Sequence, residues 1–352
     1  MPVVRTAVTA LAASLSLSPL ALGQTVEPPF DSVYTLVDLG NPVGVPSPLG
    51  GLTLKANDAN TLLIGGAANS PLGVIHAVPL ERTEGRVTGF AGASTYFADA
   101  PHNDGGLAYG PGGVLFFTRY SLHQLGQILP GETTMHRTDS LAINGFTGSV
   151  GALQFVPAAY QSTGGVMALA SYNSALWARA DLSPAGDGSY DIASLTVGPN
   201  IGGGPEGIIY VTPGSPLFPN PSIIVCDYAG GKVVAYELDA NGDPIVSTRR
   251  TFISGLSGAE GAYLEPTTGD FFFSTFGAGS RVVVVRGFSA APCPGDVDGD
   301  GFIGFADLNA VLSAFNTFDG QPSYNAAADF DDDGDVDFGD LNVVLSAFNT
   351  DC

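Results

Sequence analysis

The sequence predicts a mainly β protein: a five- or six-bladed β-propeller followed by a small module of two acidic loops and two helices. Three observations support this fold class. The 352 residues include 48 Gly and 25 Pro, and only 13% are charged, which is typical of a turn-rich β protein. A weak repeat runs through the middle of the chain, and its last sixty residues contain two near-copies of one acidic unit.

The weak repeat has a period of about fifty residues. Its five copies begin at Gly50, Asp104, Val150, Glu206 and Glu260. Each copy has a short strand beside a glycine, a turn, an apolar strand that ends in a polar residue, a glycine-containing hairpin and a third strand. A radial array of such units predicts a propeller. A β-sandwich or a β-helix is the alternative architecture.

The last copy has only three strands before Pro292. Residues 33–39 (VYTLVDL) form an unassigned strand near the N-terminus, which we expect to complete the last blade and close the ring. This arrangement gives five blades. A six-bladed ring is the alternative if residues 110–151 contain a further blade.

The N-terminus is typical of a secretory signal over residues 1–23. Arg5 supplies the positive region, an apolar stretch follows, and Ala21-Leu22-Gly23 predicts cleavage before Gln24. A retained membrane anchor is the alternative. We therefore expect a secreted or cell-surface protein, with a propeller over residues 24–288, a linker over 289–292 and the acidic module over 293–352.

The acidic unit occurs at residues 296–317 and again, 33 residues later, at 329–350. Acids occupy positions 1, 3, 5 and 12 of each twelve-residue loop: Asp296, Asp298, Asp300 and Asp307, then Asp329, Asp331, Asp333 and Asp340. Glycine holds position 6, where the chain must turn sharply. Ca²⁺ takes six to eight oxygen ligands, and alternate residues of a tight loop can supply them.

Other loop positions complete the predicted ligand sets. Position 7 offers a backbone carbonyl, from Phe302 and Asp335, and Asp337 holds position 9 of the second loop. Gly304 holds position 9 of the first loop, so water must serve there. The sequence thus predicts two Ca²⁺ ions. A solvated acidic tail is the alternative.

A helical period follows each loop. The apolar positions are Leu308, Val311, Leu312 and Phe315, and then Leu341, Val344, Leu345 and Phe348. The apolar residues at position 8, Ile303 and Val336, predict that the two loops pair as a short ribbon. A core this small needs bound ions for much of its stability.

This duplicated loop–helix unit resembles the type I dockerin family. The CPGD start at 293–296, the FADL and FGDL segments and the final Cys352 are similar to the dockerin-like modules of planctomycete secreted proteins. The resemblance implies paired EF-hand-like calcium loops. It also implies docking to a cohesin-like protein through loop positions 10 and 11, here Phe305-Ala306 and Phe338-Gly339, and the adjoining helix.

The fourth and fifth copies resemble gluconolactonase-type and NHL-type propellers through PEGI at 205–208, Cys226-Asp227-Tyr228, AEGA at 259–262 and DFFFSTFG at 270–277. The resemblance implies a divalent metal in the central channel, held by Glu206 and Glu260, with Asp104 at the equivalent place of the second copy. Three converging carboxylates repel one another unless a cation or water separates them. Alternatively, they accept hydrogen bonds from turn N–H groups or face solvent at the rim.

The formal net charge of −22 comes largely from the acidic module, which has 13 Asp and no Glu, Lys or Arg. This charge argues against nucleic acid or an anionic membrane as partner. Cys293 and Cys352 bracket the module, and in an exported protein they predict a disulfide. Cys226, in an apolar run, is expected to be a buried single thiol.

Three function classes follow, of which the third is a purely structural surface protein. The first is a binding or display protein that docks through its calcium module and presents a propeller of unknown ligand. The second is an enzyme, a metal-dependent lactonase or hydrolase or a carbohydrate-active enzyme, that works at the channel. Because the sequence contains no GxSxG, HExxH, Walker A or CxxC motif, it favours the first without excluding the second.

Overall fold

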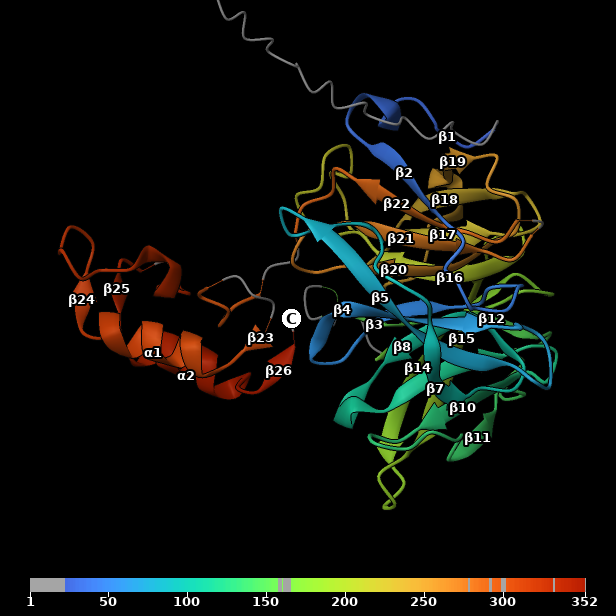
Figure 1. Ribbon diagram of the computed structural model, residues 1–352, viewed down its shortest axis with the longest axis horizontal. Coiled ribbons are helices and arrows are strands. Elements are labelled where there is room, and N and C mark those ends of the chain that lie inside the picture. The colour runs from blue at the N-terminus through green and yellow to red at the C-terminus, as the bar shows by residue number, and fades with distance from the viewer. Residues whose placement is uncertain are drawn as a thin grey trace, which may run out of the picture.

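The structure, a computed structural model, describes residues 23–157, 160, 166–277, 279–290, 293–298, 302–331 and 333–351. The predicted signal up to residue 22, residues 291–292 of the predicted linker, Asp300 and Cys352 lie outside the described residues. The protein is mainly β, with 45% strand, and forms a five-bladed propeller with two short helices near the C-terminus (Figure 1). The predicted fold class is therefore confirmed.

The first three blades follow the chain in order. Blade 1 contains β3 (Leu52–Lys55), β4 (Asp58–Gly66), β5 (Val74–Thr83), and β6 (Arg86–Phe90) and β7 (Thr95–Asp99), both paired with β5. Blade 2 contains β8 (Asn103–Tyr109), β9 (Leu115–Arg119), β10 (Gln124–Ile128) and β11 (Arg137–Ser140). Blade 3 contains β12 (Val150–Phe155), β13 (Met167–Ser171), β14 (Leu176–Pro184) and β15 (Tyr190–Asn200). The six-bladed alternative is wrong, because residues 110–151 supply the outer strands of blade 2.

The last two blades each include a strand from the N-terminus. Blade 4 contains β16 (Pro205–Tyr210), β17 (Ser222–Asp227), β18 (Lys232–Glu237) and β19 (Arg250–Ser254), with β1 (Thr25–Val26) at its outer edge. Blade 5 contains β20 (Ala259–Leu264), β21 (Phe271–Thr275), β22 (Val282–Arg286) and β2 (Thr35–Gly40). Since β2 pairs antiparallel with β22, the N-terminal segment closes the ring, as predicted.

Glycines allow the five inner strands to approach one another closely at the axis. A Cβ added at Gly105 would lie 2.7 Å from the Glu206 Oε2 atom, and one at Gly207 would lie 2.4 Å from the Ala262 nitrogen. At Gly261 the added atom would lie 2.7 Å from the Cα of Gly51. Only glycine fits such contacts, which explains the glycine near the start of each repeat.

The seam between blades 5 and 1 carries buried ion pairs. Arg82 of β5 pairs with Glu265 at 2.5 Å, and Arg86 of β6 pairs with Asp270. The Asp270 carboxylate also lies 3.5 Å from Arg286. Because Glu265 and Asp270 are buried, these pairs hold the two blades in register at the point where the ring closes.

The C-terminal module contains α1 (Phe305–Ala314) and α2 (Phe338–Ser346). Its short strands pair as β23 (Phe302–Ile303) with β26 (Thr350–Asp351), and β24 (Thr317–Phe318) with β25 (Asp335–Val336). Short 3-10 helices elsewhere are η1 (Phe30–Ser32), η2 (Pro111–Gly113), η4 (Val246–Thr248) and η5 (Ala326–Ala328).

The predicted ribbon between the two loops is wrong. Each loop pairs instead with the segment that follows the other helix. Asn316 and Asn349 take left-handed backbone angles, with φ of 61° and 66°, and turn the chain back after each helix. Their N–H groups then donate to the carbonyls of Val336 and Ile303, both at 2.7 Å.

The predicted apolar helix faces are correct only in part. Val311 and Val344 are fully buried in the module core, and Leu308 and Leu341 pack against it. Leu312 and Leu345, however, are each 51% exposed. The position-8 residues Ile303 and Val336 share this core, and Phe348 also packs against it, which leaves Leu312 and Leu345 on the surface. Among the described residues, no helix has the length and apolar character to cross a membrane.

We expect Phe30→Ala to destabilise the propeller. Phe30 is fully buried where the N-terminal segment packs against blade 4. Its ring lies 5.2 Å from that of Phe218 and 5.0 Å from that of Phe252. Because a buried phenyl ring is removed, the free energy of unfolding should fall by about 3–5 kcal/mol. Denaturant unfolding measures this change. The control Val43→Ala, at a 64% exposed position, should cost under ~0.5 kcal/mol. Equal stability of both variants would contradict ring closure by this segment.

Candidate functional site

Three carboxylates meet at the propeller axis. Asp104, Glu206 and Glu260 are each the second residue of an inner strand, β8, β16 and β20. One oxygen from each lies within 4.8 Å of the others, and the residues are 1%, 3% and 1% exposed. The structure therefore brings together all three residues of the predicted channel site. The alternative that they face solvent at the rim is wrong.

Burial controls the protonation of this cluster. It raises the pKa of Asp104 to about 7. Burial, and then the charge of Asp104, raise the pKa of Glu206 well above its usual value; burial, and then the charges of Glu206 and Asp104, do the same for Glu260. Glu206 Oε2 has no hydrogen-bond partner among the described residues. The cluster can therefore hold protons or, as three hard oxygen donors, a small cation.

An arc of aromatic side chains surrounds the axis on the same face of the propeller. Tyr120, Tyr172, Tyr228 and Phe276 directly follow the second strands of blades 2 to 5. Successive ring centroids lie 5.7, 5.7 and 5.8 Å apart. Burial raises the pKa values of Tyr172 and Tyr228, and the charges of Glu206 and Glu260 raise them further.

The sequence analysis missed this arc. Its signal was available, because an aromatic residue follows the polar end of the second strand in four of the five repeats. Blade 1 has Ala67 at this position. The arc is half-buried and thus forms the accessible layer above the enclosed carboxylates.

The structure gathers acidic side chains in both C-terminal loops. Oxygens of Asp296, Asp298 and Asp307 lie within 4.8 Å of one another, and so do those of Asp329, Asp331 and Asp333. Two oxygens on one Ca²⁺ ion can be at most about 5 Å apart, given Ca–O distances of about 2.3–2.6 Å. Both clusters therefore fit the predicted ion, while Asp300, the position-5 residue of the first loop, lies outside the described residues.

The position-12 aspartates tie each loop to its helix. Asp307 is buried and accepts hydrogen bonds from the N–H groups of Val297 and Gly304, both at 2.7 Å. The equivalent bonds of Asp340 come from Phe330, at 2.6 Å, and Asp337, at 2.8 Å. These bonds fix the start of each loop against the first turn of its helix, so the loops have a closed form.

The other predicted ligands have defined places. Asp337 is the N-cap of α2, where its side chain accepts from the Gly339 N–H. Phe302 and Asp335, whose carbonyls are predicted ligands, lie in β23 and β25. Partial desolvation and the nearby charge of Asp333 raise the pKa values of Asp331 and Asp335. Such mutual repulsion is what a bound cation would relieve.

The surface of the module carries large apolar side chains. Phe305 is 73% and Phe338 67% exposed, in the first turns of α1 and α2. Across the helix pair, Phe305 packs edge-on against Phe348 and Phe338 against Phe315, both at 5.0 Å. Leu312 and Leu345 follow seven residues later on the same helix faces. We call these four exposed residues, Phe305, Leu312, Phe338 and Leu345, the module face.

The cysteines follow the predicted division in part. Cys226 is a buried free thiol, as expected. Cys293 packs against the module core. Because Cys352 lies outside the described residues, the Cys293–Cys352 disulfide stays a prediction.

No protein-family model matches the chain, and no curated protein matches it. Several solved structures are distantly similar. A family AA12 carbohydrate-active enzyme from Trichoderma reesei has 9% identity and a TM-score of 0.46, over 75% of this chain and 98% of that one. A PQQ-bound aldose sugar dehydrogenase from Streptomyces coelicolor has 15% identity and a TM-score of 0.38, over 70% and 83%. An auxiliary nutrient binding protein from Bacteroides ovatus has 12% identity and a TM-score of 0.42, over 70% and 60%. Similarities this distant assign no activity.

We expect Asp104→Asn to stabilise the chelated protein at pH 8 but not at pH 4. Folded Asp104 keeps its proton to higher pH than the unfolded chain does, so the folded state loses stability as pH rises from about 4 towards 7. A pKa change of Asp104 from 3.8 to about 7 sets an upper limit of ~4 kcal/mol on the stability that the variant gains at pH 8, at ~1.4 kcal/mol per pKa unit.

The measurement is thermal unfolding in EDTA at both pH values, with Asp31→Asn, at an exposed position, as control. A variant that is destabilised at pH 8 would show that the Asp104 charge is compensated in the fold.

Proposed function

We propose that this is an exported protein whose C-terminal module binds two Ca²⁺ ions, attaches to a protein partner and presents the propeller outside the cell. The observation that carries the proposal is the repeated loop–helix unit, in which the carboxylates of loop positions 1 and 3 lie beside a third carboxylate in both loops. Thirteen Asp without a single basic residue would destabilise a small domain by repulsion, and two divalent cations offset that charge.

The loop geometry supports calcium rather than a solvated acidic tail. The acids of a tail would project into water. Here Asp307 and Asp340 are buried and hydrogen-bonded at the helix starts, and one oxygen of Asp307 lies within 4.8 Å of those of Asp296 and Asp298. Hard oxygen donors at this spacing favour Ca²⁺ over softer metals.

The module face supports attachment to a protein. Phe305 and Phe338 occupy loop position 10, where the dockerin-like resemblance places the partner contacts. Exposed aromatic residues beside Leu312 and Leu345 form an apolar surface of the kind found at the centre of protein interfaces. The partner we propose is therefore a folded protein with a complementary apolar surface, to which the calcium-loaded module binds.

Calorimetric titration of the mature protein should show two Ca²⁺ sites. Asp298→Ala and Asp331→Ala should each remove one site, because each deletes a carboxylate from one cluster. The double variant should also lose the far-UV helical signal of α1 and α2 at neutral pH even when calcium is present. Unchanged helicity would contradict the ligand assignment.

Attachment is tested by sedimentation of the protein with isolated cell envelopes of its source organism in the presence of calcium. Phe305→Ser with Phe338→Ser should reduce binding by at least about tenfold, which corresponds to ~1.4 kcal/mol. Phe318→Ser, at a 56% exposed position outside the module face, is the matched control. If the double variant binds as well as the control, the module face is not the contact surface.

A second candidate is a metal-dependent hydrolase at the channel, favoured by the convergence of Asp104, Glu206 and Glu260. These side chains would hold the ion, which would polarise a substrate oxygen. Their burial means that a substrate would reach the ion only after the aromatic arc had moved. A third Ca²⁺ site in the titration that disappears in Glu206→Gln would support this candidate.

A further inference from the structure

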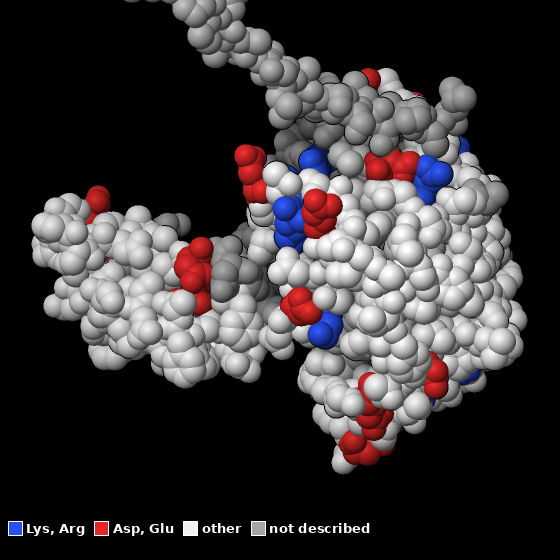
Figure 2. Space-filling view, viewed as in Figure 1, with Lys and Arg blue, Asp and Glu red and all other residues white. Residues whose placement is uncertain are grey.

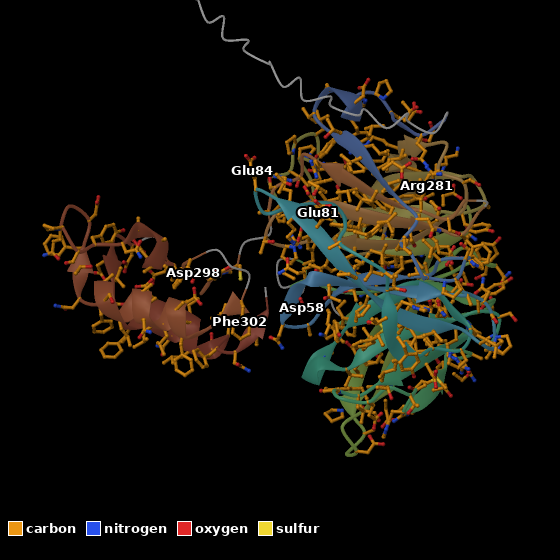
Figure 3. All side chains as sticks on the ribbon, viewed as in Figure 1. Asp58, Glu81, Glu84, Arg281, Asp298 and Phe302 are labelled. Carbon is orange, nitrogen blue, oxygen red and sulfur yellow. The ribbon has the colours of Figure 1, made fainter. Side chains whose placement is uncertain are left out.

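A cavity of about 670 Å³ lies on the face of the propeller opposite the carboxylates. The carboxylates stand at the starts of the inner strands, and the cavity is lined by residues at their ends: Lys55, Tyr109, Phe155, Tyr210 and Leu264. All five blades therefore contribute. Asn349 and Thr350 of the C-terminal module complete the rim. Figure 3 shows Asp58, another lining residue, on the side of the propeller towards the module.

Aromatic side chains from four of the five blades line part of the wall: Tyr109, Phe155, Tyr210 and Tyr263. Tyr109, Phe155 and Tyr263 come from three different blades and are half-buried. Phe155 packs edge-on against Phe116 at 5.3 Å, and Tyr263 lies 6.3 Å from Phe272, so the core holds these rings in place. Rigid, partly exposed rings bury a ligand at a low cost in conformational entropy.

The charges that line the cavity are balanced. Lys55 and Asp58 pair with each other at 3.3 Å. Glu265 is buried and is paired with Arg82 at 2.5 Å. The Gln154 amide is also satisfied, since it donates to the Ile208 carbonyl at 3.3 Å and accepts from the Phe155 N–H at 2.9 Å. The visible face of the propeller is likewise mostly uncharged (Figure 2). Among the described residues, a ligand that enters here meets aromatic surface, neutral polar groups and no unbalanced charge.

We propose that this cavity binds a neutral oligosaccharide. The C–H faces of a pyranose ring pack on aromatic rings, while its hydroxyls exchange hydrogen bonds with neutral groups at the rim such as Thr267, Asn349 and Thr350. The volume lies within the range of about 300–1,000 Å³ of small-molecule sites and suits two or three sugar residues. The site lies at a junction of two parts of the chain, where ligand sites are frequent. The proposal does not depend on catalysis at the axis.

The test is calorimetric titration of the full mature chain with neutral trisaccharides of β-1,4-linked glucose, xylose and mannose, and with an anionic trigalacturonate. At least one neutral probe should bind, and trigalacturonate should bind at least about tenfold more weakly. Tyr109→Ala should weaken the binding of the neutral probe by about tenfold or more. Tyr96→Ala, at a 53% exposed position outside the cavity, should leave it unchanged.

A second variant separates lost binding from lost folding. Thr267 is exposed at the rim and packs into no core, so Thr267→Trp should narrow the opening, keep the wild-type melting temperature and abolish binding of the neutral probe. The proposal is overturned if no neutral probe binds at millimolar concentration, if trigalacturonate binds best, or if the well-folded Thr267→Trp variant binds as wild type does.

Discussion

The close approach of five inner strands around one axis is the constraint on which the rest of the propeller depends. Backbones this close leave room only for glycine at Gly105, Gly207 and Gly261. The side chains of the residues that precede these glycines converge at the axis. These residues are Asp104, Glu206 and Glu260, so the close packing of the inner strands also brings three carboxylates together out of water. Their raised pKa values follow from that enclosure. The ring then needs a device to hold it shut, which β2 and the ion pairs of Asp270 supply at the seam between blades 5 and 1.

The C-terminal module is stabilised differently. The propeller buries large apolar layers between its blades, whereas the module has a core of a few residues such as Val311 and Val344 and a large excess of acid. The stability of the module therefore depends on cations that offset the charge of its Asp side chains. Its exposed apolar residues remain available for a partner. This difference agrees with the proposed function, in which the propeller is a rigid body and the module provides a calcium-dependent attachment.

The two faces of the propeller differ in chemistry. The face with the strand starts has tyrosines above enclosed carboxylates, and the face with the strand ends has an open aromatic cavity of balanced charge beside the module. Since the first site is closed and the second open, the second is the better place for a ligand of appreciable size. Attachment through the module and binding at the neighbouring cavity would bring the ligand close to the surface that holds the protein.

The sequence by itself determined the repeat, the five strand-leading positions, the closing N-terminal strand and both acidic loops, because each depends on local spacing that survives in one dimension. It also pointed to Asp104, Glu206 and Glu260, since equivalent positions of a radial repeat must face one axis. Only the tertiary structure decided that these carboxylates are buried and that Leu312 and Leu345 face outwards. It also decided that each loop pairs with the segment that follows the other helix. Burial and strand pairing depend on which segments meet across long separations, and a local pattern such as a helical stripe does not specify its neighbour. The cavity opposite the carboxylates has the same origin, because Tyr109, Phe155 and Tyr263 belong to blades 2, 3 and 5 and line one cavity only in the closed ring.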